Sequence, residues 1–458
     1  MHVRGKSILS LAVAASLIAG VRLQPPLATG GTALARPVAQ VAAATVGSLV
    51  PVTVAVPAGM RGAPFNVSRT LNVPRGFGIS VYARIPGARF MVITPDGNLL
   101  VSSPTQGKIV LVRPGRGGEP IVGDFATGLS QPQGMVFHAI GGTTYLYVGE
   151  VNQIDRYTWH TGDLKAGRRQ VIIGNLPSAP TADGDTHMLK DLVFGPNNKL
   201  YVSLGSSCNA CTGDRTSTPE RAAIYQYNAD GSGGRLFARG LRNAEGLAFV
   251  PGTATLWITA NERDNIAYPY ADATGQYGKV VRSYVDNHPP DEFTSVRQGG
   301  DYGWPYCNPN PAGGYDNMPF DADAQYNQTG TYNPHGGVVN CQRMDRIVKG
   351  IQAHSAPLGL TFLQSTKAPR RLQPGAVIAL HGSWDRSVKT GYKVIYFPWL
   401  HDSGTGHPGT QEDLVTGWLD SAGQNAWDRP VDLVVDPQGH LLLSADASGT
   451  IYKLTSPG

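Results

Sequence analysis

A single histidine in the sequence is well placed for proton transfer. His187 lies in the stretch DGDTHMLKDLVFGPNNKLYVSLGSS, residues 183–207, just before two apolar alternating runs joined by a Gly-Pro-Asn-Asn turn. Such runs with such a turn predict a β-hairpin, so the imidazole is carried on a loop that leads into a strand. Because a neutral imidazole can remove a hydroxyl proton near neutral pH, His187 is a candidate general base.

Other polar side chains occupy the equivalent place, just before a similar apolar run elsewhere in the chain. They are Arg89, Gln131, Gln133, Arg242, Asn243, His354 and Arg429. Each of them taken alone is more simply explained as a solvated loop residue, or as a structural histidine. Their shared position favours one ring of hydrogen-bond donors, which suits an anionic ligand with several carboxylates.

The strands that must position these side chains belong to a repeated hairpin. Its copies begin at Met91, Gly134, Asp191, Gly246, Gly359 and Asp432. A third strand follows several copies, and no convincing amphipathic helix separates them. The repeats predict an all-β fold, a six-bladed β-propeller, in which the innermost strands start near one end of the central channel. The ring of polar residues is therefore expected to converge there.

Composition agrees with a turn-rich β protein. The chain has 458 residues, with 57 Gly, 34 Pro and only 16% charged residues. The net charge of +5 is modest, and no Lys/Arg-rich run is present, so nothing indicates a nucleic-acid partner.

The N-terminus has the pattern of an export signal. Arg4 and Lys6 precede an apolar stretch from Ile8 to Ile18, and small residues follow. The sequence thus predicts a secreted or periplasmic protein without stable membrane insertion after cleavage, although an uncleaved anchor is an alternative. We expect a signal peptide and the start of a flexible tether at residues 1–40, a low-complexity linker at 41–72, and the propeller domain at 73–458.

Four cysteines fit an oxidising compartment. Cys208 and Cys211 form the motif CNAC, while Cys307 and Cys341 lie at the ends of a polar insertion. We expect each of these two pairs to form a disulfide. The alternative is a zinc site built from all four thiolates, which the spacing of CNAC would allow.

From about Val73 to the C-terminus the chain resembles the soluble pyrroloquinoline-quinone (PQQ) dependent sugar dehydrogenases. The resemblance is carried by HMLKDLVFGPNNKLYVSLGSSCN, PERAAIYQYNADGSG, GLRNAEGLAF, NERD, DYGWPYC, HSAPLGL, HGSWDR and RPVDLVVDPQGHLLLSADASGTIYKL. The sorbosone and pyranose dehydrogenase branch is the most similar. The resemblance implies a six-bladed propeller with PQQ in the funnel at one end and Ca²⁺ bridging the quinone and the protein.

The resemblance also implies roles for individual residues. His187 matches the catalytic base, and Arg242 with Asn243 matches the pair beside the reactive quinone carbonyl. The predicted cofactor-binding residues are Arg89, Gln131, Arg242, Asn243, His354, Arg386 and Arg429. The family's calcium is held by main-chain carbonyls, which here would belong to Asn261, Glu262 and Arg263.

The expected activity is oxidation of the hydroxyl or hemiacetal carbon of a sugar or sugar-derived aldehyde. His187 would take the hydroxyl proton, hydride would pass to PQQ, and an external cytochrome, quinone or dye would accept the electrons. Two departures put the exact sugar in doubt: Thr186 stands where the glucose-oxidising branch has an acid, and Trp384, Asp385 or Arg386 replaces a cofactor-contacting lysine.

Two other functions are compatible with a propeller. A Ca²⁺-dependent lactonase or hydrolase would need inward-facing carboxylates at several of the ring positions, where this sequence has Arg, His and Gln instead. A non-catalytic binding module would need neither cofactor nor activity.

Overall fold

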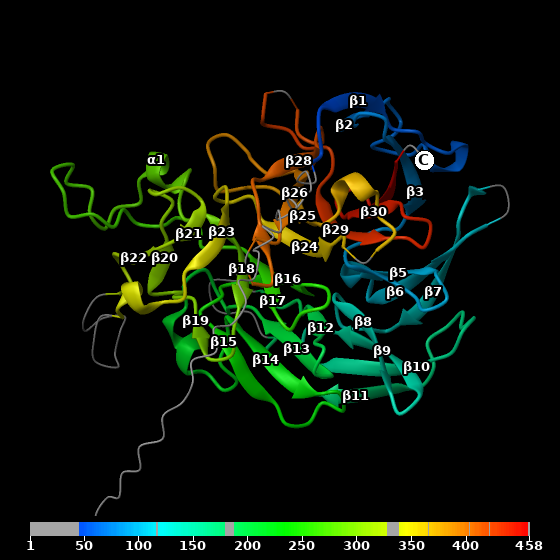
Figure 1. Cartoon of the computed structure of the whole chain (residues 1–458), viewed down its shortest axis with the longest axis horizontal. Coiled ribbons are helices and arrows are strands. Elements are labelled where there is room, and N and C mark those ends of the chain that lie inside the picture. The colour runs from blue at the N-terminus through cyan, green and yellow to red at the C-terminus, as the bar shows by residue number, and fades with distance from the viewer. Residues whose placement is uncertain are drawn as a thin grey trace, which may run out of the picture. The chain divides into compact units, whose positions relative to one another are not determined.

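A computed structural model describes residues 45–115, 118–178, 187–327, 339–364, 366–402, 404–420 and 422–456. The expected signal segment at 1–40 lies outside these residues. The described part of the chain is built almost wholly of strands and forms the predicted six-bladed β-propeller (Figure 1). None of its helices is both long and apolar enough to cross a membrane.

The first three blades follow one another along the sequence. Blade 1 contains β4 (Met91–Ile93), β5 (Leu99–Ser103), β6 (Lys108–Arg113) and β7 (Ile121–Thr127). Blade 2 contains β8 (Met135–Ile140), β9 (Thr143–Gly149), β10 (Ile154–Trp159) and β11 (Arg169–Ile173). Blade 3 contains β12 (Leu192–Phe194), β13 (Lys199–Leu204), β14 (Ala223–Asn228) and β15 (Arg235–Arg239), with the short β19 (Gly300–Asp301) at its edge.

The other three blades complete the ring. Blade 4 contains β16 (Ala244–Phe249), β17 (Leu256–Ala260), β18 (Asp291–Val296), β23 (Ile347–Ile351) and β21 (Asp316–Met318). Blade 5 contains β24 (Pro357–Phe362), β25 (Gly375–Leu380) and β26 (Lys393–Leu400), with β27 (His407–Pro408) and β28 (Glu412–Val415) both paired to β26. Blade 6 contains β29 (Pro430–Val435), β30 (Leu441–Ala445), β31 (Thr450–Thr455) and β3 (Gly78–Arg84).

Blade 6 closes the ring by joining the two ends of the propeller. Its outer strand β3 comes from the N-terminal side and pairs antiparallel with β31, from Gly78 opposite Thr455 to Arg84 opposite Thr450. Alternate residues of β3 are buried, as expected of a strand with one face on the core. This pairing places a strand from each end of the propeller in one sheet and so holds the ring closed.

The innermost strands of neighbouring blades lie very close together. A Cβ at Gly359 of β24 would lie 2.7 Å from the Cα of Asp432 in the next blade, so only glycine permits this approach. The Asp432 carboxylate in turn accepts a hydrogen bond of 2.8 Å from the main-chain N of Met91 in blade 1. Asp191 makes the same kind of link, accepting from the N of Leu247 at 3.0 Å. Close backbone contacts and buried carboxylates thus hold the innermost strands of neighbouring blades together at the end of the channel where the polar ring was predicted.

The described part of the expected linker is folded, which differs from the flexible segment predicted for residues 41–72. Strand β1 (Leu49–Thr53) pairs with β2 (Thr70–Pro74). Val54, Phe65 and Leu71 are buried in the same hydrophobic cluster as residues of blades 5 and 6. The low charge and the Ala/Pro/Val content suggested a flexible segment. Its apolar residues instead pack against the hydrophobic residues of blades 5 and 6.

The cysteine pairing is as predicted. Disulfides join Cys208 to Cys211 and Cys307 to Cys341, so the alternative of a four-thiolate zinc site is wrong. The second disulfide closes the insertion in blade 4, where β20 (Cys307–Pro309) pairs with β22 (Phe320–Ala322). A short helix, α1 (Arg282–Val285), precedes β18.

Candidate active site

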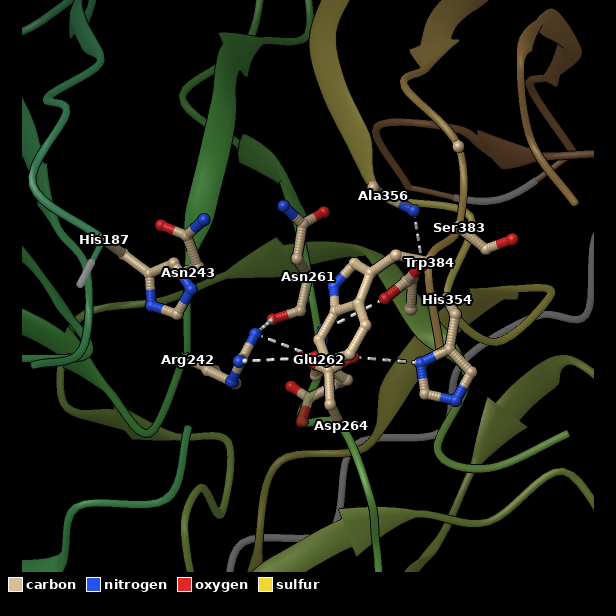
Figure 2. Close-up of a pocket in the computed structure, with 12 residues that line it drawn as sticks. His187, Arg242, Asn243, Asn261, Glu262, Asp264, His354, Ala356, Ser383 and Trp384 are labelled. Atoms are coloured by element: carbon tan, nitrogen blue, oxygen red, sulfur yellow. Dashed lines mark hydrogen bonds and ion pairs between the residues drawn. The ribbon is translucent and has the colours of Figure 1, made fainter. Parts of the chain in front are cut away.

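A cavity of about 420 Å³ opens among the loops of blades 3, 4 and 5 (Figure 2). It is lined by His187, Arg242, Asn243, Asn261, Glu262, Asp264, Asp291, His354, Ala356, Gly382, Ser383 and Trp384. Most of these residues either precede the first strand of a blade or follow its second strand. Because those two strands are antiparallel, both positions lie at the same end of the blade.

The imidazole of His187 is oriented by a hydrogen bond from its Nδ1 atom to Ser206. Its Nδ1 lies 2.8 Å from the Oγ of Ser206, and this hydroxyl lies 2.8 Å from the carbonyl of Cys208. Since the carbonyl can only accept, Ser206 donates to it and therefore accepts from Nδ1–H. We assign the tautomer from this network: the proton sits on Nδ1, and Nε2 carries a lone pair.

Electrostatics keep this imidazole neutral. Burial, and then the positive charges of Arg242 and Arg221, hold the pKa of His187 well below its usual value. A neutral imidazole with a free lone pair on Nε2 is the form that a general base requires.

Arg242 lies against the loop that follows β17. Its guanidinium is 3% exposed and donates at 2.8 Å to the carbonyl of Glu262 and at 3.5 Å to that of Asn261. The carboxylate of Asp264 lies 3.4 Å away. A positive charge is thus fixed at the cavity wall, in the same pocket as His187.

The same loop supplies oxygen atoms with no protein partner. Within the described residues, Asn261 Oδ1 and Glu262 Oε2 are buried and make no hydrogen bond. Burial raises the pKa of Glu262 to about 8. Both side-chain atoms are oxygen donors of the kind that a hard cation such as Ca²⁺ prefers, while the main-chain carbonyls of the same two residues accept from Arg242 in this structure. The residues present therefore fit a calcium ion.

His354 offers a second positive charge. Its Nε2 contacts the carbonyl of Val285 at 2.8 Å, and its Nδ1 lies 3.4 Å from Asp264. Burial alone would lower the pKa of His354, but the hydrogen bond with Asp264 and the charge of Asp291 outweigh it and raise the pKa. The backbone of His354 is left-handed, with φ at +63°, a conformation that non-glycine residues adopt rarely and often at functional sites.

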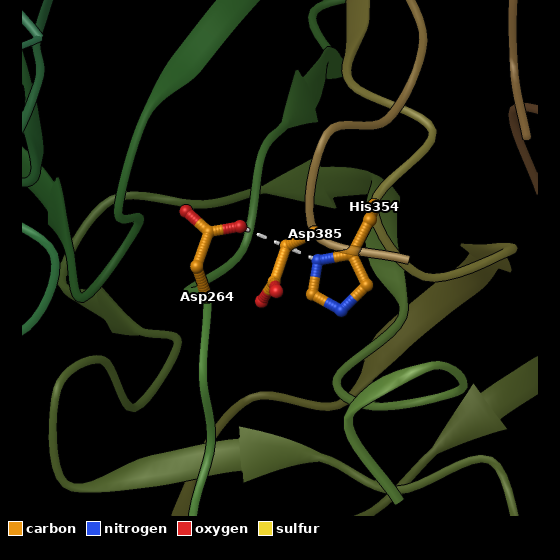
Figure 3. A group of neighbouring side chains, drawn as sticks. All are labelled: Asp264, His354 and Asp385. Carbon is orange, nitrogen blue, oxygen red and sulfur yellow. Dashed lines mark ion pairs between the residues drawn. The ribbon is translucent and has the colours of Figure 1, made fainter. Parts of the chain in front are cut away.

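His354 also belongs to a small group with metal-ligand chemistry (Figure 3). Ligand atoms of Asp264, His354 and Asp385 lie within 4.8 Å of one another. The carboxylate of Asp385 already accepts from Arg282 at 2.9 Å and from the N of Asn265 at 2.8 Å. These three residues therefore offer a less open position for a cation than the loop at Asn261 and Glu262.

Two of the predicted arginines do not line the cavity. Arg89 pairs with Asp446 at 2.7 Å and donates to Gln133 at 3.0 Å. Arg429 donates at 2.9 Å to the carbonyl of Gly382, which does line the cavity. The predicted ring is therefore only partly formed: neutral His187 meets Arg242, Asn243 and His354 in the cavity, whereas the charges of Arg89 and Arg429 act on Asp446.

Three further predicted residues point elsewhere. The side chain of Gln131 is exposed and does not line the cavity. Arg386 donates to the carbonyls of Asp286 and Val388. The side chain of Arg263 forms a buried ion pair with Asp323 of the insertion. None of these three residues lines the cavity, whereas a main-chain role of Arg263 does not depend on its side chain.

Several polar residues of the site went unnoticed in the sequence. Glu245 accepts from both Gln133 at 2.6 Å and Asn243 at 3.0 Å. His381 contacts Asp446 at 2.9 Å. These contacts join the predicted ring residues into one network and hold Asn243 against the cavity.

Gly205 allows His187 to sit where it does. A Cβ at this position would lie 2.5 Å from the Cβ of His187 and 2.8 Å from Oδ1 of Asn243. We expect Gly205→Ala to displace both and to lower kcat by about 100-fold, with about 1–3 kcal/mol lost from the free energy of unfolding. Steady-state kinetics and thermal melts would measure this. Gly213→Ala, with nothing within 4 Å of its Cβ, is the control; equal losses in both variants would contradict the argument.

Comparison with known proteins defines the class to which this propeller and cavity belong. The sequence model of the TrAA12-like family matches residues 71–457. The chain is thus a member of the TrAA12-like family, in the PQQ-dependent sugar dehydrogenase group that its sequence resembles.

Individual relatives agree with this assignment. A pyrroloquinoline quinone-dependent sugar dehydrogenase of Hypocrea jecorina is 25% identical over 346 residues, 70% of this chain and 73% of that protein. The holo form of the pyranose dehydrogenase PQQ domain from Coprinopsis cinerea has a TM-score of 0.66 at 20% identity, covering 84% of this chain and 97% of that one. A calcium structure of the AA12 enzyme of Trichoderma reesei has a TM-score of 0.66 at 21% identity, covering 84% and 96%. The structural likeness shows the shared fold.

Proposed function

We propose that this protein is a PQQ-dependent dehydrogenase that oxidises the hydroxyl or hemiacetal carbon of a sugar or sugar-derived aldehyde. The observation that carries the proposal is the neutral His187, which shares one cavity with Arg242 and with an oxygen-rich loop at residues 261–264. The export signal predicted from the sequence and the two disulfides support a secreted or periplasmic location.

The residues of the cavity can be divided by what they would hold. Arg242 and Asn243 would offer donors beside the reactive carbonyl of PQQ, and His354 would offer one to a carboxylate of the cofactor. Asn261 and Glu262 offer oxygen atoms to Ca²⁺. The relatives named for a holo PQQ domain and for a calcium structure support both ligands. When bound, the quinone would supply the two-electron acceptor and the calcium ion would polarise it.

The protein's own part in the reaction is proton removal and charge stabilisation. His187 accepts the hydroxyl proton of the sugar at Nε2, while the Nδ1–H bond to Ser206 keeps the ring oriented. Arg242, fixed at the cavity wall, stabilises negative charge that develops in the transition state.

The pH profile should reflect the lowered pKa of His187. Only the neutral imidazole accepts a proton, so kcat/KM falls as the pH drops through this pKa. Because the pKa lies well below the ordinary value of 6.5, activity should persist to distinctly lower pH than an unperturbed histidine would allow. A pH–rate profile of kcat/KM measures this, and an acidic limb at or above pH 6.5 would contradict the assignment.

Trp384 is the best candidate for contact with the sugar. It lines the cavity and is 70% exposed, an unusual position for an indole (Figure 2). Aromatic rings suit the apolar C–H face of a pyranose. We expect Trp384→Ala to raise KM about tenfold with little change in kcat, a loss of about 1.4 kcal/mol of binding. Trp384→Phe should retain most of the affinity; an unchanged KM in the alanine variant would rule out this contact.

One experiment tests the proposed function. The purified protein is mixed with PQQ and Ca²⁺, freed of unbound cofactor, and assayed for quinone absorbance and for dye reduction by a panel of aldoses and sugar aldehydes. Retained absorbance with sugar-dependent dye reduction is the expected result. Lactone hydrolysis with Ca²⁺ alone would favour the hydrolase alternative, and neither binding nor turnover would favour a binding module.

A further inference from the structure

The turn closed by the Cys208–Cys211 disulfide contacts three parts of the candidate site. Its four residues, CNAC, follow directly on the segment that holds His187, and the two Cα atoms lie 5.4 Å apart. The turn belongs to the loop between β13 and β14 of blade 3, whereas two of its contacts are in blade 4.

The first contact is with Arg242. The Nε atom of Arg242 donates at 3.1 Å to the main-chain carbonyl of Asn209, and Nη2 donates at 3.0 Å to the side-chain oxygen of the same residue. One residue of the turn thus binds two edges of the guanidinium and fixes the plane in which it lies.

The second contact is with the loop that follows β17. The N of Asp264 donates to Oδ1 of Asn209 at 2.8 Å, and Nδ2 of Asn209 donates back to the carbonyl of Asp264 at 2.9 Å. A side-chain amide that accepts from the main-chain N–H and donates to the main-chain carbonyl of one residue acts as a clamp. The clamp lies two residues from Glu262, which lines the cavity and whose carbonyl accepts from Arg242.

The third contact is with the base. The carbonyl of Cys208 accepts the hydroxyl proton of Ser206, and this leaves the Ser206 oxygen to accept from Nδ1–H of His187. The tautomer of His187 therefore depends on where the disulfide-closed turn places one carbonyl.

We propose that the CNAC turn is the positioning element of this site, with Asn209 as its central positioning residue. The proposal rests on the function proposed above for His187 and Arg242. The disulfide cross-links residues three apart, so the carbonyl of Cys208 and the side chain of Asn209 are held in one arrangement. Without the disulfide, the Cys208 carbonyl and the Asn209 side chain would move independently. The hydrogen bonds that position His187, Arg242 and the loop at residues 261–264 would then no longer depend on one rigid turn.

The first test needs no cofactor and no activity. In the cofactor-free protein, Asn209→Ala removes the acceptor for the N–H of Asp264, so hydrogen exchange of peptides covering residues 261–264 should become at least tenfold faster, while peptides of blades 1 and 2 exchange as before. Thr212→Ala, directly after the turn, is the matched control and should leave both unchanged. Unchanged exchange at residues 261–264 in Asn209→Ala would overturn the proposal.

The second test reads the tautomer of His187. With ¹⁵N-labelled histidine, the cofactor-free wild type should show a protonated Nδ1 and an unprotonated Nε2. Ser206→Ala should give a mixture of tautomers, and Ser206→Thr, which keeps the hydroxyl, should restore the single form. The same spectrum in the wild type and in Ser206→Ala would show that the turn does not set the tautomer and would overturn that part of the proposal.

The third test uses turnover. Asn209→Ala should lower kcat by about 10–100-fold with a smaller change in KM, since positioning and not substrate contact is lost. Asn209→Asp keeps an acceptor for Arg242 and should fall in between. The double change Cys208→Ser with Cys211→Ser should lower kcat similarly, whereas Cys307→Ser with Cys341→Ser should lower the melting temperature but spare kcat.

The outcomes separate the two proposals. If the wild type neither binds PQQ nor oxidises sugars, the proposed function fails, but the exchange and tautomer measurements still decide whether the turn positions these residues. If the wild type is active and Asn209→Ala retains full kcat with unchanged exchange, the positioning role is wrong and the proposed function stands.

Discussion

His187→Ala should lower kcat by about 10³-fold while PQQ remains bound with Ca²⁺. General base catalysis contributes about 10²–10⁴-fold, and this histidine supplies the one lone pair that we assign to the task. The side chain lines the cavity, but its ring contacts Ser206 and not the loop at residues 261–264. Binding should therefore survive the change. Single-turnover reduction of the bound quinone by sugar, together with a PQQ titration, measures both quantities.

A second, partly buried histidine provides the matched control. His381 lies at the same end of the channel, but it contacts Asp446 and does not line the cavity. Burial lowers the pKa of His381 to about 4. His381→Gln should therefore cost far less in kcat than His187→Ala. If His187→Ala kept kcat near that of the wild type, our assignment of the base would be wrong.

Arg242→Met should lower kcat by about 10²–10³-fold, the usual cost of removing one donor that stabilises developing negative charge. The change also removes a positive charge that lowers the pKa of His187, so the acidic limb of the pH–rate profile should move to higher pH. Arg242→Lys keeps the charge, but a single ammonium cannot reproduce the contacts to both Asn209 and Glu262.

The lysine variant should therefore show intermediate turnover and an acidic limb close to that of the wild type. Pre-steady-state kinetics across pH 4 to 8 would measure both effects, with the pH range chosen around the ordinary histidine pKa of about 6.5. Loss of turnover without any shift of the limb in Arg242→Met would contradict the electrostatic coupling between the two residues.

Much of the fold could be predicted from the sequence because the repeats carry strong local signals. Alternating apolar runs and Gly/Pro turns locate the first two strands of every blade, and the six copies correspond to β4, β8, β12, β16, β24 and β29. The closing strand β3 could not be found in this way. Its partner β31 lies more than 360 residues away, and no local pattern reveals a pairing over that distance.

The sequence predicted one part of the candidate site better than another. Residues before the first strand of each blade include His187, Arg242 and His354, which do meet in the cavity. After the second strand, the resemblance supplied Asn261, Glu262, Arg263 and Arg386, but His381 and Asp446 were not predicted. Antiparallel pairing brings these two positions together, as Pro430 of β29 opposite Ala445 of β30 shows. The short motifs HGS and SAD could therefore have been included from the sequence alone.

The roles of Arg89 and Arg429 depend on side-chain direction, which a repeat pattern does not contain. Arg89 pairs with Asp446, whereas Arg429 donates to the carbonyls of His381 and Gly382. Burial would raise the pKa of Asp446, but His381 and the charges of the two arginines outweigh it and lower this pKa to about 2. The contacts of Asn209 could not be predicted from the sequence either. They join a disulfide turn to residues 33 and 55 positions away, and only the tertiary structure shows them.

The most direct test of the central claim is a crystal structure of the protein grown with PQQ and Ca²⁺. Our account predicts the quinone in the cavity lined by His187, Arg242 and His354, with calcium bound to main-chain carbonyls of the loop at residues 261–263. PQQ bound outside this cavity, or calcium held only by the side chains of Asp264, His354 and Asp385, would contradict it.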